Sequence, residues 1–238
     1  MSGGGELGRT ELPESIAIRE CGESLVPIPA DRFALTQPHA YGSLGAPYGN
    51  RSPYCIRTGV LKRLIAAQSY LQQDAPGWTL QIFDAYRPIA VQRFMVDHAF
   101  AELARAQGRD PDALRADPES AAAIAIWQQV FEFWAPPSSN PATPPPHSTG
   151  AALDVTLLDA TGAPAAMGSP IDECSPRSYP DHFRDCPELP YHAHRQLLAG
   201  AMRAAGFVRH PREWWHFSWG DRLWAQLSGT AIAHYGSI

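Results

Sequence analysis

Four side chains in two separated segments have the types and spacing of a metal-dependent hydrolytic site. His147 and Asp154 stand seven residues apart, and Glu213 precedes His216 by three residues in the segment Glu-Trp-Trp-His. Two imidazoles and one carboxylate can hold a zinc ion with one coordination position left open. The second carboxylate would then be free to move protons, and zinc lowers the pKa of a bound water to about 7. The sequence therefore predicts a catalytic zinc site.

Two predicted strands must position these groups. Asp154 lies inside a predicted strand at residues 151–158, and His216 lies inside another at residues 214–219. Side chains three residues apart in a regular strand point to opposite faces of the sheet. Glu213 and His216 can therefore share one cavity only at a strand end or a kink. The alternative is an aromatic-rich edge strand whose glutamate and histidine both face water.

Hydrophobic periodicity predicts several helices and two further strands in the rest of the chain. The predicted helices span residues 59–74, 89–107, 118–134, 190–205 and 222–227, and the predicted strands span residues 78–84 and 207–208. Asp117 is the expected N-cap of the third of these helices. Residues 135–146, which lead into His147, and residues 162–190 are expected to be loops. Because strands and helices do not alternate regularly, we expect a fold of the α+β class.

Two other groups of residues could contribute to a site. In the segment Asp84-Ala-Tyr-Arg87-Pro88, the proline could fix an arginine whose guanidinium points into a site at a strand end. Taken alone, this segment fits a surface ion pair better than a site residue. His192 and His194 could form a rival metal pair, but residues two apart on a helix do not face each other. We expect these two histidines at a solvated helix terminus.

Composition and charge exclude several classes of protein. The 238 residues are 45% hydrophobic and include 7 Trp, 8 Tyr and 9 Phe, which is enough apolar material for the core of one domain. We expect this domain at residues 13–238, after a flexible tail at residues 1–12. The formal net charge is −5, and there is no basic stripe or polybasic cluster. Nucleic-acid and membrane partners are therefore not expected.

Targeting features are also missing from the sequence. No apolar run is long enough to span a bilayer, and the first residues lack the basic start and apolar stretch of a secretory signal. A cytoplasmic location is therefore expected. The four cysteines show no Cys-x-x-Cys pairing and are expected to be reduced thiols. No feature of the sequence indicates an oligomeric state.

Four motifs follow one another along the chain in a recognisable order. They are Asp-Ala-Tyr-Arg-Pro at 84–88, His-Ser-Thr-Gly-Ala-Ala-Leu-Asp at 147–154, Met-Gly-Ser-Pro-Ile-Asp at 167–172 and Glu-Trp-Trp-His at 213–216. Their order resembles that of the zinc D-alanyl-D-alanine dipeptidases, over roughly the stretch from Tyr54 to Trp219. Several motifs in the right order are far more specific than any one of them.

The resemblance implies a role for each site residue and a small dipeptide as substrate. One Zn²⁺ per chain would be held by His147, Asp154 and His216. Glu213 would be the catalytic base, Arg87 would stabilise the transition state, and Asp172 would hold the ammonium of the substrate. The implied fold is that of the Hedgehog signalling domain and the zinc D-Ala-D-Ala carboxypeptidases, in which helices flank a central antiparallel sheet. In that fold the glutamate and the histidine of the last motif reach one site.

The chain departs from the family pattern in the length of the segment between Arg87 and His147, which is longer than usual, and at two places that concern the substrate. Pro145 stands where the family commonly has a serine that is associated with gripping the substrate carboxylate. The family's early segment often supplies a tyrosine near the substrate ammonium. Ala30 to Tyr41 matches that segment poorly, and Phe33 is expected to occupy the position without a hydroxyl.

Two alternative functions stay open. The first is a D,D-carboxypeptidase that acts on longer cell-wall peptides; Asp172 and the missing signal peptide favour the dipeptidase over it. The second is a non-catalytic zinc-binding module, in which the metal serves stability or partner binding. Glu213 and Arg87 argue against the module, because a structural zinc site needs neither a base nor an oxyanion donor.

Overall fold

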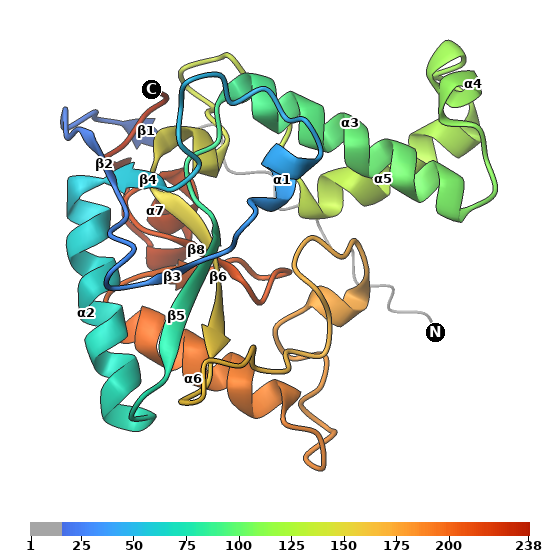
Figure 1. Ribbon diagram of the computed structural model, residues 1–238. Helices are drawn as coiled ribbons and strands as arrows, with labels where there is room; N and C mark the ends of the chain where they lie inside the picture. The colour runs from blue at the N-terminus through green and yellow to red at the C-terminus, as the bar shows by residue number, and fades with distance from the viewer. Residues whose placement is uncertain (1–15) are drawn as a thin grey trace, which may run out of the picture.

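A five-stranded mixed sheet forms the centre of the computed structural model, which describes residues 16–238 (Figure 1). The strand order is β3 (Ala34–Leu35), β5 (Thr79–Asp84), β6 (Ala152–Leu158), β8 (His216–Ser218) and β7 (Val208–Arg209). Neighbouring strands are antiparallel from β5 to β7, whereas β3 pairs with β5 in parallel. A helix-containing crossover separates β3 from β5, as parallel pairing requires. The expected α+β class is confirmed, and β3 makes the sheet mixed.

Two small sheets lie outside the central one, and the first of them joins the two ends of the described chain. β1 (Ala17–Ile18) pairs in parallel with β9 (Ile232–Ala233), and β2 (Leu25–Pro27) pairs in antiparallel fashion with β4 (Cys55–Arg57). These strands have two or three residues each, which is too few for a periodic pattern, so the sequence predicted a range for none of them. The expected tail at residues 1–12 lies outside the described residues.

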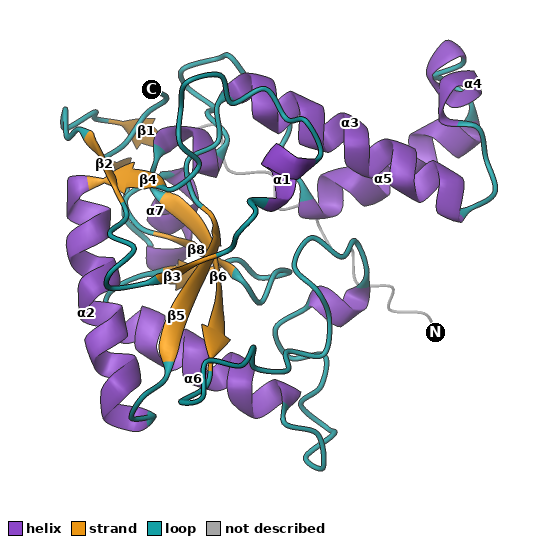
Figure 2. Cartoon of the chain, viewed as in Figure 1, coloured by secondary structure: helices purple, strands orange, loops and turns teal. Residues whose placement is uncertain are grey.

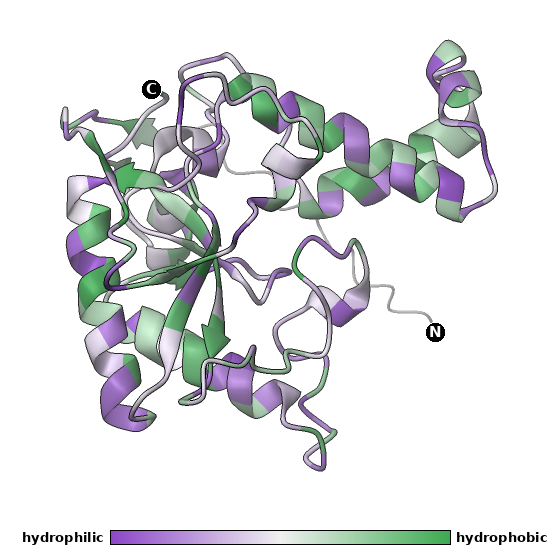
Figure 3. Cartoon of the chain, in the orientation of Figure 1, coloured by the Kyte–Doolittle hydropathy of each residue, from purple (hydrophilic) through white to green (hydrophobic). Residues whose placement is uncertain are grey.

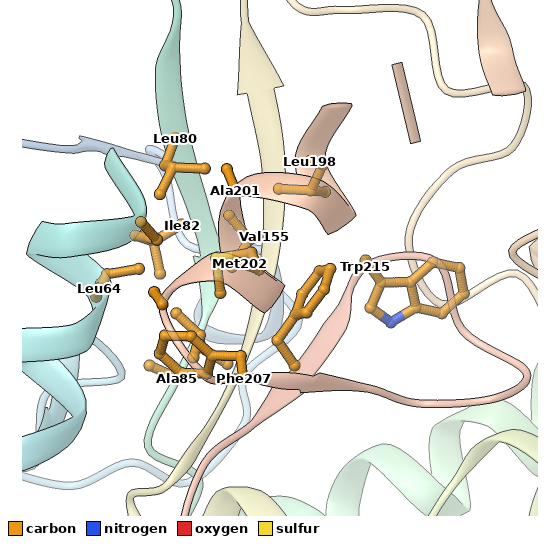
Figure 4. Close-up of a cluster of buried hydrophobic side chains, with 14 of the residues drawn as sticks. Leu64, Leu80, Ile82, Ala85, Val155, Leu198, Ala201, Met202, Phe207 and Trp215 are labelled. Carbon is orange, nitrogen blue, oxygen red and sulfur yellow. The ribbon is translucent and has the colours of Figure 1, made fainter. Parts of the chain in front are cut away.

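Helices α2 (Thr58–Asp74) and α6 (Tyr191–Ala204) cover one face of the sheet (Figures 1 and 4). Strand residues that alternate toward this face are fully buried and apolar. With their helical partners they include Leu80, Ile82, Leu153, Val155, Leu157, Leu64, Leu198 and Met202. Hydrophobic residues accordingly line the central strands, while the helices carry hydrophilic residues as well (Figure 3). We call this side of the sheet the apolar face.

Helices α3 (Ile89–Ala106) and α5 (Ala121–Phe133) pack against each other as an arm that extends away from the sheet, with α4 (Pro111–Ala116) near its tip (Figure 2). The arm has its own apolar core. The predicted N-cap Asp117 is wrong, because the side chain of Ser120 caps α5. Asp117 instead ends α4, a helix that was not predicted and that starts with the capping side chain of Asp110 followed by a proline.

The remaining elements are short. They are α1 (Ala40–Ser43), the 3₁₀ helices η1 (Pro146–Thr149) and η2 (Pro176–Ser178), and α7 (Arg222–Ser228). The helices predicted at residues 59–74, 89–107, 190–205 and 222–227 are confirmed within two residues at either end. The strand predicted at 214–219 is wrong in extent, since β8 holds only three residues. Within residues 16–238, no helix has the length and apolar character needed to cross a membrane.

Candidate active site

Strand register places three polar side chains side by side on the face of the sheet opposite the apolar face. Asp154 pairs with Asp84 on one neighbouring strand and with His216 on the other. Residues directly opposite in an antiparallel pair project from the same face. A bulge between Ile82 and Asp84 interrupts the alternation of β5. The extra residue turns Asp84 away from the apolar face, which Ile82 occupies, and toward Asp154.

His147 reaches this group of side chains from η1, just before β6. The helix ends at Gly150, whose φ of +70° is left-handed; a Cβ there would lie 2.4 Å from the end of the Leu25 side chain, so glycine is strongly favoured. His147 Nδ1 lies 2.7 Å from the carbonyl oxygen of Ala85, to which it can donate. That hydrogen bond leaves Nε2 as the free acceptor nitrogen, 3.4 Å from Asp154 Oδ2.

The three predicted zinc ligands therefore meet. Their ligand atoms lie within 4.8 Å of one another, all three residues are buried, and they form the one such cluster found among residues 16–238. His147 Nε2 is 3.1 Å from His216 Nδ1, which in turn is 3.2 Å from Asp154 Oδ1. Two imidazole nitrogens and a carboxylate oxygen that converge in this way fit the ligand preference of zinc. His194 is not part of the cluster; its Nδ1 contacts the carbonyl oxygen of Ala166.

Glu213 lies beside the cluster without joining it. It sits in the bend before β8, so the opposite-face geometry of a regular strand does not apply. Its Oε2 is 3.7 Å from His216 Nδ1, and its Oε1 is 3.5 Å from His210 Nδ1. Burial first, and then the charges of Asp154 and Asp172, raise the pKa of Glu213 well above its usual value. A carboxylate with a raised pKa suits a group that accepts and returns a proton.

Arg87 is held rigidly at the edge of the cluster. Its Nε and Nη2 donate to Asp84 Oδ2 at 3.1 and 2.8 Å, and its Nη1 donates to Gln92 Oε1 at 2.8 Å. Nη2 also lies 3.4 Å from Asp154 Oδ2. Burial, the largest single effect, would raise the pKa of Asp84, but the Arg87 guanidinium, the hydrogen bond to His39 and the charge of His147 together keep that pKa below its usual range. Asp84 therefore stays ionised and orients the guanidinium.

Asp172 reaches the same place from the long loop after β6. Its φ of 68° is left-handed, an uncommon conformation for a residue other than glycine. The Tyr41 hydroxyl donates to Asp172 Oδ2 at 2.8 Å and lies 3.2 Å from Arg87 Nη2. Burial, followed by the charge of Asp154, raises the pKa of Asp172 to about 7. This side chain is thus poorly solvated and would gain from a cationic partner.

Tyr41 is a site residue that the sequence prediction missed. Phe33, which was expected at this position, packs in the apolar core instead, so that expectation is wrong. Tyr41 belongs to α1, a helix of four residues that starts after His39, and so short an element leaves no periodic signal. The hydroxyl expected to be absent is therefore present, supplied from later in the chain.

The cluster, together with Arg87, Glu213 and Asp172, lines one pocket of about 480 Å³, a volume that includes space open to solvent. Its lining also includes Trp134, which directly follows α5 at the base of the arm, and Pro146 of η1. Pro145 precedes η1, and neither proline offers a hydroxyl to a ligand.

Comparison with known proteins gives a consistent result. Residues 34–233 match a family described as D-ala-D-ala dipeptidase. The chain is 47% identical to a D-alanyl-D-alanine dipeptidase of Synechocystis sp., over 94% of this chain and 95% of that protein. It is 33% identical to a D-alanyl-D-alanine dipeptidase of Streptomyces coelicolor, over 66% of this chain and 71% of that protein. A shorter match, 42% identical over 30% of this chain and 36% of that protein, is to a D-alanyl-D-alanine dipeptidase of Escherichia coli.

Proposed function

This chain belongs to the D-Ala-D-Ala dipeptidase family, and from that membership we propose that it hydrolyses D-alanyl-D-alanine with the buried residues of the pocket. The observation that carries the proposal is their convergence. A trio of residues that can bind a metal, a carboxylate with a raised pKa, an oriented guanidinium and an acid held by a tyrosine hydroxyl all line one small pocket, with the tyrosine itself buried behind the acid. A structural metal site would need only the first of these.

His147, Asp154 and His216 would hold one Zn²⁺. When bound, zinc supplies Lewis acidity, which polarises a carbonyl and lowers the pKa of water. Glu213 takes a proton from the attacking water as the new carbon–oxygen bond forms. It then returns that proton to the leaving nitrogen as the carbon–nitrogen bond breaks, so one dipeptide and one water give two D-alanines. Burial, followed by the charges of Asp154 and Asp172, raises the pKa of Glu213 and so its proton affinity for this exchange.

Arg87 faces the negative charge that develops on the carbonyl oxygen. Asp84 and Gln92 hold its guanidinium on two sides, so the positive charge is oriented before substrate arrives. Groups that are fixed in this way need no reorganisation during the reaction, and one such donor is worth about 3 kcal/mol of transition-state stabilisation.

Asp172 would bind the substrate ammonium in the pocket, and the buried Tyr41 would support it. The carboxylate supplies the charge, and the tyrosine hydroxyl fixes one of its oxygens. Because Asp172 and the cluster line the same small pocket, an ammonium bound by Asp172 would belong to a substrate with one residue before the scissile bond. This contact therefore favours dipeptides over the longer chains of a D,D-carboxypeptidase.

The test compares substrates that differ at the amino end. Protein of measured zinc content is given D-Ala-D-Ala, N-acetyl-D-Ala-D-Ala and a longer peptide that ends in D-Ala-D-Ala, and released D-alanine is quantified. We expect rapid release from the free dipeptide alone. Comparable release from the acetylated dipeptide or the peptide would contradict the role of Asp172 and favour the carboxypeptidase.

We extend the proposal to the architecture of the chain. Residues 13–238 would form one domain with the fold shared by the zinc D-Ala-D-Ala carboxypeptidases and the Hedgehog signalling domain. The central sheet, whose strands β5 to β7 are antiparallel, and the helices on its apolar face support this assignment.

A further inference from the structure

His216 presents its two ring nitrogens to different surroundings. Nδ1 faces the cluster, 3.2 Å from Asp154 Oδ1, whereas Nε2 lies 3.3 Å from the hydroxyl oxygen of Ser218. A neutral imidazole carries one proton, on one nitrogen or the other. A metal can bind at Nδ1 only if the proton sits on Nε2. The group that faces Nε2 therefore decides whether His216 is ready to bind a metal.

Ser218 can accept a hydrogen bond from Nε2 and still donate its own hydroxyl proton. It is fully buried, and the neighbouring carboxyl belongs to Asp221, which is 1% exposed. Burial raises the pKa of Asp221, and hydrogen bonding by the Ser218 hydroxyl opposes that rise. The hydroxyl thus stands between a metal-ligating ring and a buried acid.

The two carboxylate oxygens of Asp221 differ in their hydrogen bonds. Oδ1 accepts from the backbone N–H of Trp224 at 2.8 Å and so caps α7. Oδ2 is enclosed and has no close hydrogen-bond partner among residues 16–238. A buried acceptor without a partner is costly, so a nearby donor has a strong reason to turn toward it.

The turn after β8 brings the acid back beside the strand. Gly220 adopts a left-handed φ of +85°, and a Cβ there would lie 2.6 Å from the Tyr235 ring. Its carbonyl oxygen accepts from the backbone N–H groups of His234 and Tyr235, which fixes the turn. The close packing leaves room only for glycine, and Asp221 follows directly as the first residue beyond the turn.

We infer that Ser218 and Asp221 are positioning residues for the metal, through hydrogen bonds that run from His216 Nε2 to Ser218 Oγ and on to Asp221 Oδ2. Neither residue lines the pocket, so they act through His216 alone. The inference rests on the proposed function, since it assumes that His216 is a metal ligand. Groups that hold the outer nitrogen of a ligating histidine typically change metal affinity by about 10–100-fold.

The test uses two variants chosen to keep the fold. Ser218→Ala removes the hydroxyl, and Asp221→Asn keeps the helix cap while it replaces Oδ2 by a donor. Each should weaken zinc binding by about 10–100-fold in competition with a chelator. Because the two groups act in series, the double variant should bind zinc only slightly less tightly than the single variant with the lower zinc affinity. Nitrogen NMR of the metal-free protein should show His216 protonated on Nε2, with a mixture of tautomers in Ser218→Ala.

Controls separate this inference from the proposed function. Asp110→Asn makes the same change at the N-cap of α4 and should leave zinc affinity unchanged. Failure of the unsubstituted protein to bind zinc or to hydrolyse D-Ala-D-Ala would reject the proposed function itself. If the unsubstituted protein does both, affinity within about threefold of normal in both single variants, or an unchanged His216 tautomer, overturns the role of Ser218 and Asp221 alone.

Discussion

The two faces of the central sheet use neighbouring residues of the same strand for opposite purposes. On β6, Leu153 and Val155 point into the apolar face, whereas Asp154 between them points into the pocket. The apolar face buries side chains whose removal from water stabilises the fold, roughly 25 cal/mol for each Å². The pocket face buries carboxylates, which costs free energy unless each is paired. The free energy gained by burial on the apolar face therefore offsets the cost of the buried carboxylates on the opposite face.

The pocket face is itself uneven. Asp84 has Arg87 beside it and keeps a low pKa, whereas Glu213 and Asp172 have no such partner and their pKa values are raised. The paired acid holds another residue in place. The two acids with raised pKa values are those assigned to the proton and to the substrate ammonium. The proposed catalytic and substrate-binding roles on this face therefore fall on the acids whose ionised forms are least stabilised by the protein.

The sharpest test of the comparison is Glu213→Gln, which neutralises a pocket acid without changing its size. We expect kcat for D-Ala-D-Ala to fall by about 10²–10⁴-fold, because the amide cannot take the proton of the attacking water. Zinc content should not change, since Glu213 lies outside the trio. Steady-state kinetics on zinc-quantified protein measure the effect.

Glu188→Gln, at an exposed position, is the matched control and should keep normal kinetics. The metal-free Glu213→Gln protein should be at least as stable as the unsubstituted one, because burial disfavours the charge that it removes. A kcat within a few-fold of normal would remove Glu213 from the role of base.

Leu153→Ala tests the other face with the adjacent residue of the same strand. Removing this fully buried side chain should lower the free energy of unfolding by about 2–5 kcal/mol, because it leaves a cavity in the core. Urea unfolding of the metal-free protein measures this loss, while zinc affinity of the folded fraction should stay normal. Asp154→Asn should give the reverse: lost zinc binding with a smaller change in stability. Similar losses of stability in Leu153→Ala and Asp154→Asn would contradict the proposed difference between the two faces of the sheet.

The same contrast explains what the sequence could predict. The apolar alternation of β5 and β6 and the helical spacing of α2, α3 and α6 are local patterns, and the structure confirms them. The convergence of His147, Asp154 and His216 was predicted from motif order. Tyr41 was missed because long-range folding alone brings its hydroxyl to Asp172, 131 residues away. The bulge that turns Asp84 toward the pocket leaves no signal in the sequence either.

Arg87→Lys should have the next largest effect within the pocket. A lysine keeps the charge but cannot reproduce the planar fork that contacts Asp84 and Gln92 together. We expect kcat/KM to fall by about 10²-fold, near the lower end for loss of an oxyanion donor. A pH-independent loss with normal zinc content would fit this role. Normal kcat/KM in the variant would show that charge alone, without orientation, is sufficient at this position.

The last prediction concerns the pH dependence of the stability of the metal-free protein and comes from Asp172→Asn. The pKa of Asp172 is raised to about 7 in the folded state, against about 3.9 in an unfolded chain. Between those values the unfolded chain releases its proton while the folded protein retains it, so stability falls as pH rises through this window and is level above it. Asparagine does not titrate. The Tm of the variant, relative to the unsubstituted protein, should therefore climb from pH 4 to pH 7 in the presence of chelator. Asp185→Asn, at an exposed position, should show no such climb.

Asp172→Asn should also raise KM for D-Ala-D-Ala, because the substrate ammonium loses its partner. Parallel Tm curves for both variants would mean that Asp172 is well solvated and that the two faces differ less than their residues indicate.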